Sequence, residues 1–292
     1  MIFVDDREGG RLKSDTARRI GQWASAPLVF VLAQVRFLPN ASATPEQLRD
    51  AIIKRVGLKF PTINQTNALN FEITLDAPAP SPRRAVPLVI YDLVNSDVDA
   101  MVRIQQGSLT YAVTSYVDSP QFRSEWLAIT DALTDVDVTS VMRLGLRYVD
   151  FIIPQPGRKP EEYVKTPWNL AGVPALPGAL RGPDLNVSMM DVAYPQGRLR
   201  LQFMRGVGVP SLPMDLQGML NPRQESSSVV HAECGVIDSD RWIDGNELSV
   251  DRATLNKLFT QMHTDVSAAF RAMITPLATE EWNPTDVEGR TS

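Results

Sequence analysis

The sequence predicts an α+β fold, with a curved, mostly antiparallel sheet and helices packed on one face of it. Most of the expected strands are joined to their neighbours by short turns, a connection that links antiparallel strands. The expected helices are few and amphipathic, and they do not alternate with the strands as they do in a doubly wound fold. With 292 residues, of which 43% are hydrophobic, the chain has enough apolar surface for a substantial core.

The first strand and the first helix have clear boundaries. Residues 28–38 (LVFVLAQVRFL) are rich in β-branched and aromatic side chains and lie between two prolines, which predicts a strand. Thr44 then offers an N-cap, and Gln47 completes a capping box with it. The apolar side chains that follow recur at helical spacing, and Gly57 ends the predicted helix.

The middle of the chain combines strand-type and helix-type patterns. Phe122, Trp126 and Ile129 share one face of a predicted helix because they are spaced four and three residues apart. The elements expected here are a strand over 71–75, a proline-rich loop over 77–87, a hairpin of strands 102–105 and 108–116, a helix over 119–133 and a strand over 141–153.

The last part of the chain predicts a second hairpin and a long helix. The expected elements are strands 187–194 and 198–205, a polar loop over 209–228, a strand over 229–237 and a helix over 251–273. The two halves share a loose order of elements, which suggests a degenerate duplication of a strand-helix-strand unit.

The expected domain organisation is simple. Residues 1–25 look like an N-terminal extension, and residues 26–292 form a single α+β domain. The stretch 154–184 is rich in proline and glycine, so it is the candidate boundary if that domain divides into two subdomains.

Composition and charge exclude several classes of protein. The net charge is −5, without the overall basic excess that nucleic-acid binders usually carry. Cys234 is the only cysteine, so an intramolecular disulfide and a multi-cysteine zinc site are excluded. The start of the chain lacks the pattern of a signal peptide, and its longest apolar run, 26–33, is too short to span a membrane. We therefore expect a cytoplasmic location and no membrane partner.

Arginines in the predicted strands are the candidate binding residues. Arg143 and Arg147 lie an even number of residues apart, so they share one face of a regular strand. A sheet face lined by such guanidinium groups would bind an anionic ligand, a nucleic acid or an acidic protein surface. The alternative is that they pair with acidic side chains across strands on a solvated face. The candidates are Arg36, Arg103, Arg143, Arg147, Arg198 and Arg200.

No complete catalytic constellation is present. A serine-nucleophile signature, a P-loop and a dinucleotide fingerprint are all absent, so we expect no cofactor. Asp5, Asp6 and Glu8 follow a short apolar stretch, as the ligands of magnesium-dependent nucleases do, and they are the catalytic alternative. The competing interpretation is a solvated acidic terminus.

A second alternative uses the two histidines. The segment His231-Ala-Glu233-Cys234 is similar to the His-x-Glu of zinc nucleobase deaminases, but those sites need two further cysteines that this chain lacks. His231, Glu233 and His263, with Asp238 and Asp240, would form a mixed metal site only if the fold brought them together. The competing interpretation is that they are ordinary strand and helix residues.

Three segments resemble a known bacterial family. Residues 26–39 (APLVFVLAQVRFLP) resemble its opening strand, residues 141–152 (VMRLGLRYVDFI) its central Arg-x-Gly-Leu-Arg-Tyr strand, and residues 258–282 its closing helix. The hairpin and helix over 108–133 fit as well. The family is sporadically distributed and has no assigned activity, cofactor or catalytic residue, so the resemblance implies a bacterial protein without a stated function. Patchy distribution is common among mobile-element and defence-associated genes.

These observations favour a non-catalytic binding or assembly protein. It would act through the arginine-bearing sheet face or the proline-rich loops. The expected partner is another protein or complex, and nucleic acid stays open as a partner. The alternatives are a metal-dependent hydrolase or nuclease that uses the N-terminal acidic cluster, and a small-ligand or nucleotide sensor with the arginines inside a cavity.

Overall fold

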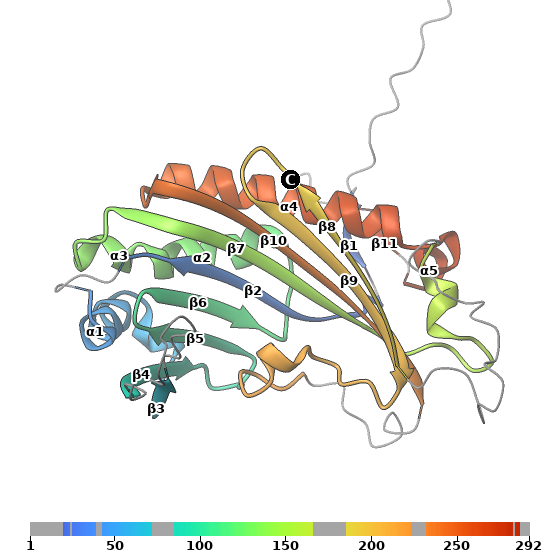
Figure 1. Ribbon diagram of the computed structural model, residues 1–292, viewed down its shortest axis with the longest axis horizontal. Coiled ribbons are helices and arrows are strands. Elements are labelled where there is room, and N and C mark those ends of the chain that lie inside the picture. Colours follow the sequence, from blue (N-terminus) through green and yellow to red (C-terminus); the bar gives the residue numbers. More distant parts are fainter. Residues whose placement is uncertain are drawn as a thin grey trace, which may run out of the picture.

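One antiparallel sheet dominates the protein (Figure 1). The computed structural model describes residues 20–23, 25–38, 43–71, 85–165, 185–222, 232–282 and 284–286. Within these residues, nine strands form a single sheet in the order β3-β4-β5-β6-β2-β7-β10-β9-β8, and every neighbouring pair is antiparallel. The predicted α+β class is therefore confirmed.

The helices and strands have the following bounds. The strands are β1 (Ile20–Trp23), β2 (Leu28–Arg36), β3 (Thr62–Phe71), β4 (Ala85–Val94), β5 (Ala100–Gln105), β6 (Ser108–Val113), β7 (Ser140–Ile152), β8 (Leu185–Ala193), β9 (Arg198–Val207), β10 (Glu233–Ser249) and β11 (Pro284–Asp286). The α-helices are α1 (Pro45–Val56), α2 (Ser119–Thr130), α3 (Ala132–Asp135), α4 (Arg252–Met273) and α5 (Pro276–Trp282), and the 3-10 helices are η1 (Gly57–Lys59), η2 (Pro160–Tyr163) and η3 (Met214–Leu216). Strands β1 and β11 pair with each other, outside the large sheet.

The three long helices begin at residues that cap them. Thr44 accepts a hydrogen bond from the Gln47 backbone N–H, and the Gln47 side chain bonds back to the Thr44 N–H, so the predicted capping box is present. Asp118 caps α2 through the Gln121 N–H, and Asp251 caps α4 through that of Thr254.

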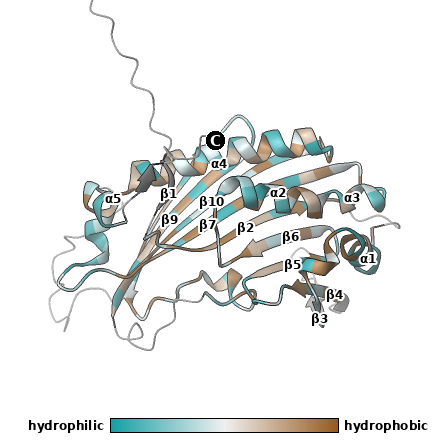
Figure 2. Cartoon of the chain, turned by 180° about the vertical axis from the view of Figure 1, so that it is seen from behind, coloured by the Kyte–Doolittle hydropathy of each residue, from teal (hydrophilic) through white to brown (hydrophobic). Residues whose placement is uncertain are grey.

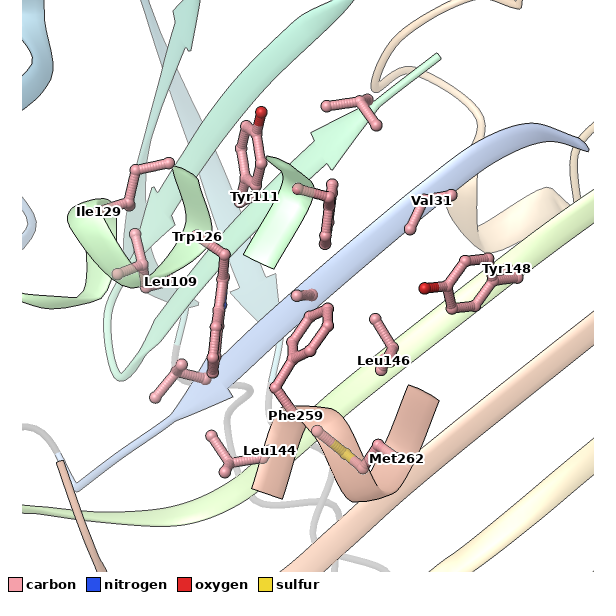
Figure 3. Packing of buried hydrophobic residues seen from close by; sticks show 14 of the residues in the cluster. Val31, Leu109, Tyr111, Trp126, Ile129, Leu144, Leu146, Tyr148, Phe259 and Met262 are labelled. Carbon is pink, nitrogen blue, oxygen red and sulfur yellow. The ribbon is translucent and has the colours of Figure 1, made fainter. Parts of the chain in front are cut away.

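The main core lies between the sheet and these helices. Helices α2 and α4 cross the near side of the sheet in Figure 2. Trp126 of α2 and Phe259 of α4 contact each other with ring centroids 5.4 Å apart, above Leu144 and Leu146 of β7 (Figure 3). All four side chains are buried, so burial of apolar area against one face fixes the helices there.

The structure differs from the sequence prediction in several places, among them strands β1 and β11, which are not predicted. Strands β3 and β4 are not predicted at these positions, because the proline-rich stretch before Pro87 and the polar side chains of β3 hide them. Strand β10 continues to Ser249, far beyond the predicted end at residue 237. Helix α5 is not predicted. The segment expected as a polar loop over 209–228 buries several apolar side chains within its described part.

The two halves of the sheet have the same arrangement around its central pair. Strand β2 pairs with β7, and each is flanked by the last strand of a meander, β6 on one side and β10 on the other. A helix follows each meander, α2 after β6 and α4 after β10. This is the arrangement that a duplicated unit of strand, meander and helix would have. No helix in the described parts of the chain is long and apolar enough to cross a membrane.

Candidate binding face of the sheet

The sheet has a second face, opposite helices α1–α4, which we call the open face. Side chains alternate between the two faces along each strand, so the pairing register decides which residues share a face. One row of the open face runs across four strands and contains Asp191, Arg200, Asp240 and Arg147. The same register places all six predicted arginines on this face: Arg36, Arg103, Arg143, Arg147, Arg198 and Arg200.

Part of the open face is covered by residues 208–222, which we call the covering segment. It packs a small second core against the sheet, made with the apolar ends of β2, β7 and β10. Its buried side chains are Val209, Leu212, Leu216 and Leu220. Burial of these four side chains holds the segment on the sheet, so this area is not a free surface.

Two of the six arginines hold the covering segment in place. Arg147 donates to Asp238 of β10 at 2.8 and 2.7 Å, and to Asp215 of the segment at 2.5 and 3.2 Å. Burial alone would lower the pKa of Arg147, but the hydrogen bonds to the two carboxylates raise it above its ordinary value. Arg103 donates to Asp92 at 2.8 Å and to the Gly218 carbonyl at 3.0 Å. Both guanidinium groups are occupied within the protein.

The other four arginines lie on the uncovered area, where three of them neighbour Trp242, a side chain that is only 9% exposed. The Arg143 guanidinium lies 4.5 Å from the centroid of the Trp242 ring, and that of Arg200 lies 5.9 Å from it. The Trp242 indole N–H donates to Asp244 at 2.8 Å, so the ring is fixed from both sides. A Cβ added at Gly145, the cross-strand partner of Trp242, would contact only Gln34, at 4.0 Å, so there is space directly above the Gly145 backbone.

Two arginines of this area face each other without an acid between them. Arg36 of β2 and Arg143 of β7 are direct cross-strand partners. Arg143 reaches Asp244 only at 3.8 Å, and within the described residues Arg36 has no ion pair. Like charges opposite each other destabilise a sheet. This position therefore has positive charge that the described residues neutralise only in part, through the pair of Arg143 with Asp244.

An apolar stripe lies on the same face along the edge strand β8. Leu185, Val187 and Met189 are 57%, 45% and 61% exposed, and the register places all three on the open face. Farther along β8, Asp191 accepts two hydrogen bonds from Arg200, at 2.8 and 2.9 Å. The hydrogen bonds from Arg200 lower the pKa of Asp191. The uncovered area thus combines guanidinium groups, which lie over a largely buried indole, with exposed apolar side chains.

The residues of the two metal alternatives are not brought together in the described structure. Asp5, Asp6, Glu8 and His231 lie outside the described residues. Glu233 accepts a hydrogen bond from Arg205 at 2.9 Å. It lies six residues along β10 from Ser239, the cross-strand partner of Tyr148, and hence about 20 Å from it.

His263 has a different surrounding, on the helix side of the sheet. Its Nδ1 atom lies 3.0 Å from the Tyr148 hydroxyl, and burial, with help from Arg271 and Arg123, lowers its pKa to about 4. Glu233 and His263 are therefore too far apart to share an ion. The described residues contain no group of three or more His, Cys, Asp or Glu side chains arranged to hold a metal.

Several residues of the open face are not identified by sequence patterning. The predicted strand ends at residue 237, so the prediction names Asp238 and Asp240 only as candidate metal ligands and places neither them nor Trp242 and Asp244 on the strand. Their even spacing is the signal that finds them once β10 is extended.

Arginine side chains beside an indole can bind carboxylates with two hydrogen bonds and can stack on planar groups. The exposed apolar stripe adds a surface that favours contact with a protein. Comparison with protein-family models, with curated proteins and with solved structures gives no match.

Proposed function

We propose that this protein is a non-catalytic binding protein that receives an acidic segment of another protein on the uncovered area of the open face. The observation that carries the proposal is the direct pairing of Arg36 with Arg143. Their repulsion costs stability in the free chain. Carboxylates of a partner would neutralise it, so binding would remove a cost that the isolated protein carries.

A protein partner suits this face better than a nucleic acid. Asp191, Asp240 and Asp244 lie among the arginines, so the positive charge of this face is interrupted and does not form the continuous basic track that a phosphate backbone uses. Arginine and tryptophan are enriched at the energetic centres of protein interfaces. The apolar stripe of β8 offers the apolar contact that such interfaces also use.

The setting we propose is a bacterial assembly of the mobile-element or defence-associated kind. It rests on the family resemblance of residues 26–282. A binding role is supported by Arg143 and Arg200, which take part in ion pairs and cation–π contacts rather than in a group of side chains arranged for catalysis.

The experiment is a titration of two labelled probes, polyglutamate and a single-stranded DNA oligonucleotide, at physiological salt. We expect polyglutamate to bind more tightly than DNA. The double variant Arg36→Glu, Arg143→Glu should lose about tenfold or more of that affinity. The matched control is Lys54→Glu, Lys257→Glu, which makes the same change in charge on exposed positions of α1 and α4.

Three outcomes contradict the proposal. They are tighter binding of DNA, no binding of polyglutamate by the unmodified chain, and equal losses in the arginine and lysine variants. Equal losses would mean that overall charge, rather than this face, decides binding.

A further inference from the structure

The free edge of the sheet at β8 has unpaired backbone groups. Among the residues that the structure describes, strand β8 is the last in the sheet order and pairs only with β9, in an uninterrupted register of nine residues. At the hairpin turn, the Tyr194 N–H donates to the Gly197 carbonyl at 3.1 Å. Hydrogen-bonded pairs alternate along an antiparallel ladder, so the even-numbered residues of β8 bond to β9. The N–H and C=O groups of its odd-numbered residues point away from the sheet.

The same odd-numbered residues carry the apolar stripe. Leu185, Val187 and Met189 are exposed, and β8 has no proline, lysine or bulge that would protect its edge. The opposite edge of the sheet is different, because the exposed part of β3 presents mainly Asn, Gln and Thr side chains. An edge that is long, regular and apolar is the kind that pairs with another strand.

The charge at the hairpin end of β8 selects what pairs with it. Asp191 is occupied by Arg200, whereas Arg198 is 58% exposed and approaches Asp191 only at 4.0 Å. Of the two arginines at this end, Arg198 is therefore the one with the weaker ion pair. Arg198 is the cross-strand partner of Ala193, so a carboxylate placed opposite Ala193 on an added strand would come within reach of it.

We propose that β8 receives an extended segment of the partner protein as a tenth, antiparallel strand. The segment would place apolar side chains opposite Leu185, Val187 and Met189 and an acidic side chain opposite Ala193. This inference rests on the proposed function, because it adds a second contact of the same partner, at the edge of the sheet three strands away from Arg143. Main-chain hydrogen bonds would supply affinity, and the apolar stripe and Arg198 would supply the choice of sequence.

A second copy of the chain fits this edge less well. Antiparallel pairing of β8 with itself about Met189 places Asp191 opposite Val187 of the second copy and Ala193 opposite its Leu185. Arg198 would then meet an apolar side chain instead of a carboxylate. The charge at the hairpin end therefore favours a segment of another protein.

The test uses a labelled nine-residue peptide matched to β8, acetyl-Glu-Thr-Thr-Thr-Val-Thr-Val-Thr-Leu-amide, and the full-length chain. We expect binding by fluorescence anisotropy at physiological salt. N-methylation of the two valine amides removes hydrogen bonds to β8 without changing charge, and it should weaken binding about tenfold or more. Unchanged binding of the N-methylated peptide, or no binding of the parent peptide, would overturn the proposal.

Protein variants locate the site. Val187→Pro removes an outward N–H but no bond to β9, and Met189→Lys places a charge in the stripe; each should weaken binding about tenfold or more. Ile63→Lys on the opposite edge strand β3 is the control, and this variant should bind the peptide as tightly as the unmodified chain does. Far-ultraviolet circular dichroism checks that each variant is folded, and Met189→Lys decides the result if Val187→Pro does not fold.

A charge exchange tests the role of Arg198. Arg198→Glu should weaken binding of the peptide that begins with Glu. It should strengthen binding of the counterpart that begins with Lys, because the ion pair with residue 198 is then restored with reversed signs. An equal change in affinity for both peptides would show that Arg198 does not contact the first residue of the peptide.

Two results separate this inference from the proposed function. Binding of polyglutamate without binding of the peptide overturns strand addition alone and leaves the function in place. Concentration-dependent dimerisation in light scattering that Val187→Pro abolishes would show that the edge is used by a second copy, and it would overturn the inference.

Discussion

Arg241 shows how one buried charge joins three parts of the protein. Its side chain is fully buried on the helix side of the sheet and donates to Asp265 of α4 at 2.9 Å. It also donates to the carbonyls of Gln196 and Arg198 at 3.0 and 3.3 Å, and its guanidinium lies 4.4 Å from the Tyr194 ring centroid. These contacts attach the β8–β9 hairpin to α4.

We predict that Arg241→Ala lowers the free energy of unfolding by about 3–5 kcal/mol, because Asp265 is left without its partner. Denaturant unfolding measures the change. Arg55→Ala is the control, since its ion pair with Asp135 is more exposed and should contribute less than about 1 kcal/mol. Equal losses of unfolding free energy in the two variants would show that the buried contacts of Arg241 contribute no more to stability than an exposed ion pair.

Asp150 makes the stability depend on pH. Its side chain is 5% exposed, on the helix side between Leu28 and Ile237, and no described residue forms a hydrogen bond with its carboxyl group. Burial, with a smaller effect of Asp238, raises its pKa from 3.8 to about 8. The native state therefore keeps a proton that the unfolded state has lost between these two values.

The contribution of Asp150 to stability is complete below its unfolded pKa and is lost as the pH rises toward 8. We predict a fall of up to about 1.4 kcal/mol per pH unit from this group. Asp150→Asn keeps the shape without the titration, so it should flatten this part of the profile and increase stability at pH 8. Urea unfolding at several pH values measures it, and parallel profiles for the two proteins would contradict the prediction.

The surroundings of Asp150 and Arg241 could not be predicted from the sequence. Alternation along 141–153 places Asp150 on the same face as Leu146 and Tyr148, but it does not show whether a partner lies above the carboxyl group. Arg241 lies beyond the predicted end of its strand. The placement of Arg143 with Arg147, and of Arg198 with Arg200, was predictable because an even separation fixes a shared face whatever the tertiary structure.

The covering segment is the element that divides the open face into a covered and an uncovered area. Its composition predicts a polar loop, whereas Leu212, Leu216 and Leu220 are buried against the sheet. Few residues of the segment have regular secondary structure, so no periodicity reveals the burial from sequence. Strand β4 was also missed from the sequence, because Pro87 indicates a loop in sequence whereas the structure has it within the strand.

We predict that Asp215→Asn loosens the covering segment, because Arg147 then loses its charged partner there. Hydrogen exchange of residues 209–222 should accelerate, whereas Asp244→Asn on the uncovered area should leave it unchanged. The pKa of Asp215 is lowered by its hydrogen bonds with Arg147, although burial opposes this. The ion pair is thus complete above the ordinary carboxyl pKa and is lost as the pH falls through the lowered value, so acid should have the same effect as the substitution. Exchange that is insensitive to both would contradict this account.

At the scale of the whole molecule, the central strands and the two long helices join the two halves. Strands β2 and β7 pair from Leu28 to Arg36, with one irregularity near the start. The ring centroid of Phe259 on α4 lies 6.0 Å from that of Phe122 and 5.4 Å from that of Trp126, both on α2. The antiparallel class and the helix-covered face were predictable from turns and amphipathic spacing. The strand order was not, because pairing between distant strands leaves no local signal.

We predict that denaturant unfolds the chain in a single transition, because this contact extends across both halves. Phe259→Ala should lower the free energy of unfolding by about 3–5 kcal/mol and keep the single transition. Two separate transitions, recorded by tryptophan fluorescence and circular dichroism, would show instead that the halves fold independently.

The central claim is that the uncovered area of the open face receives an acidic protein partner. It is tested most directly by affinity capture from a bacterial lysate with three forms of the chain: unmodified, Arg36→Glu with Arg143→Glu, and Lys54→Glu with Lys257→Glu. The account predicts that the unmodified chain and the lysine variant retain the same acidic protein in stoichiometric amount, and that the arginine variant does not. Retention of that protein by the arginine variant, or recovery of nucleic acid alone, would contradict it.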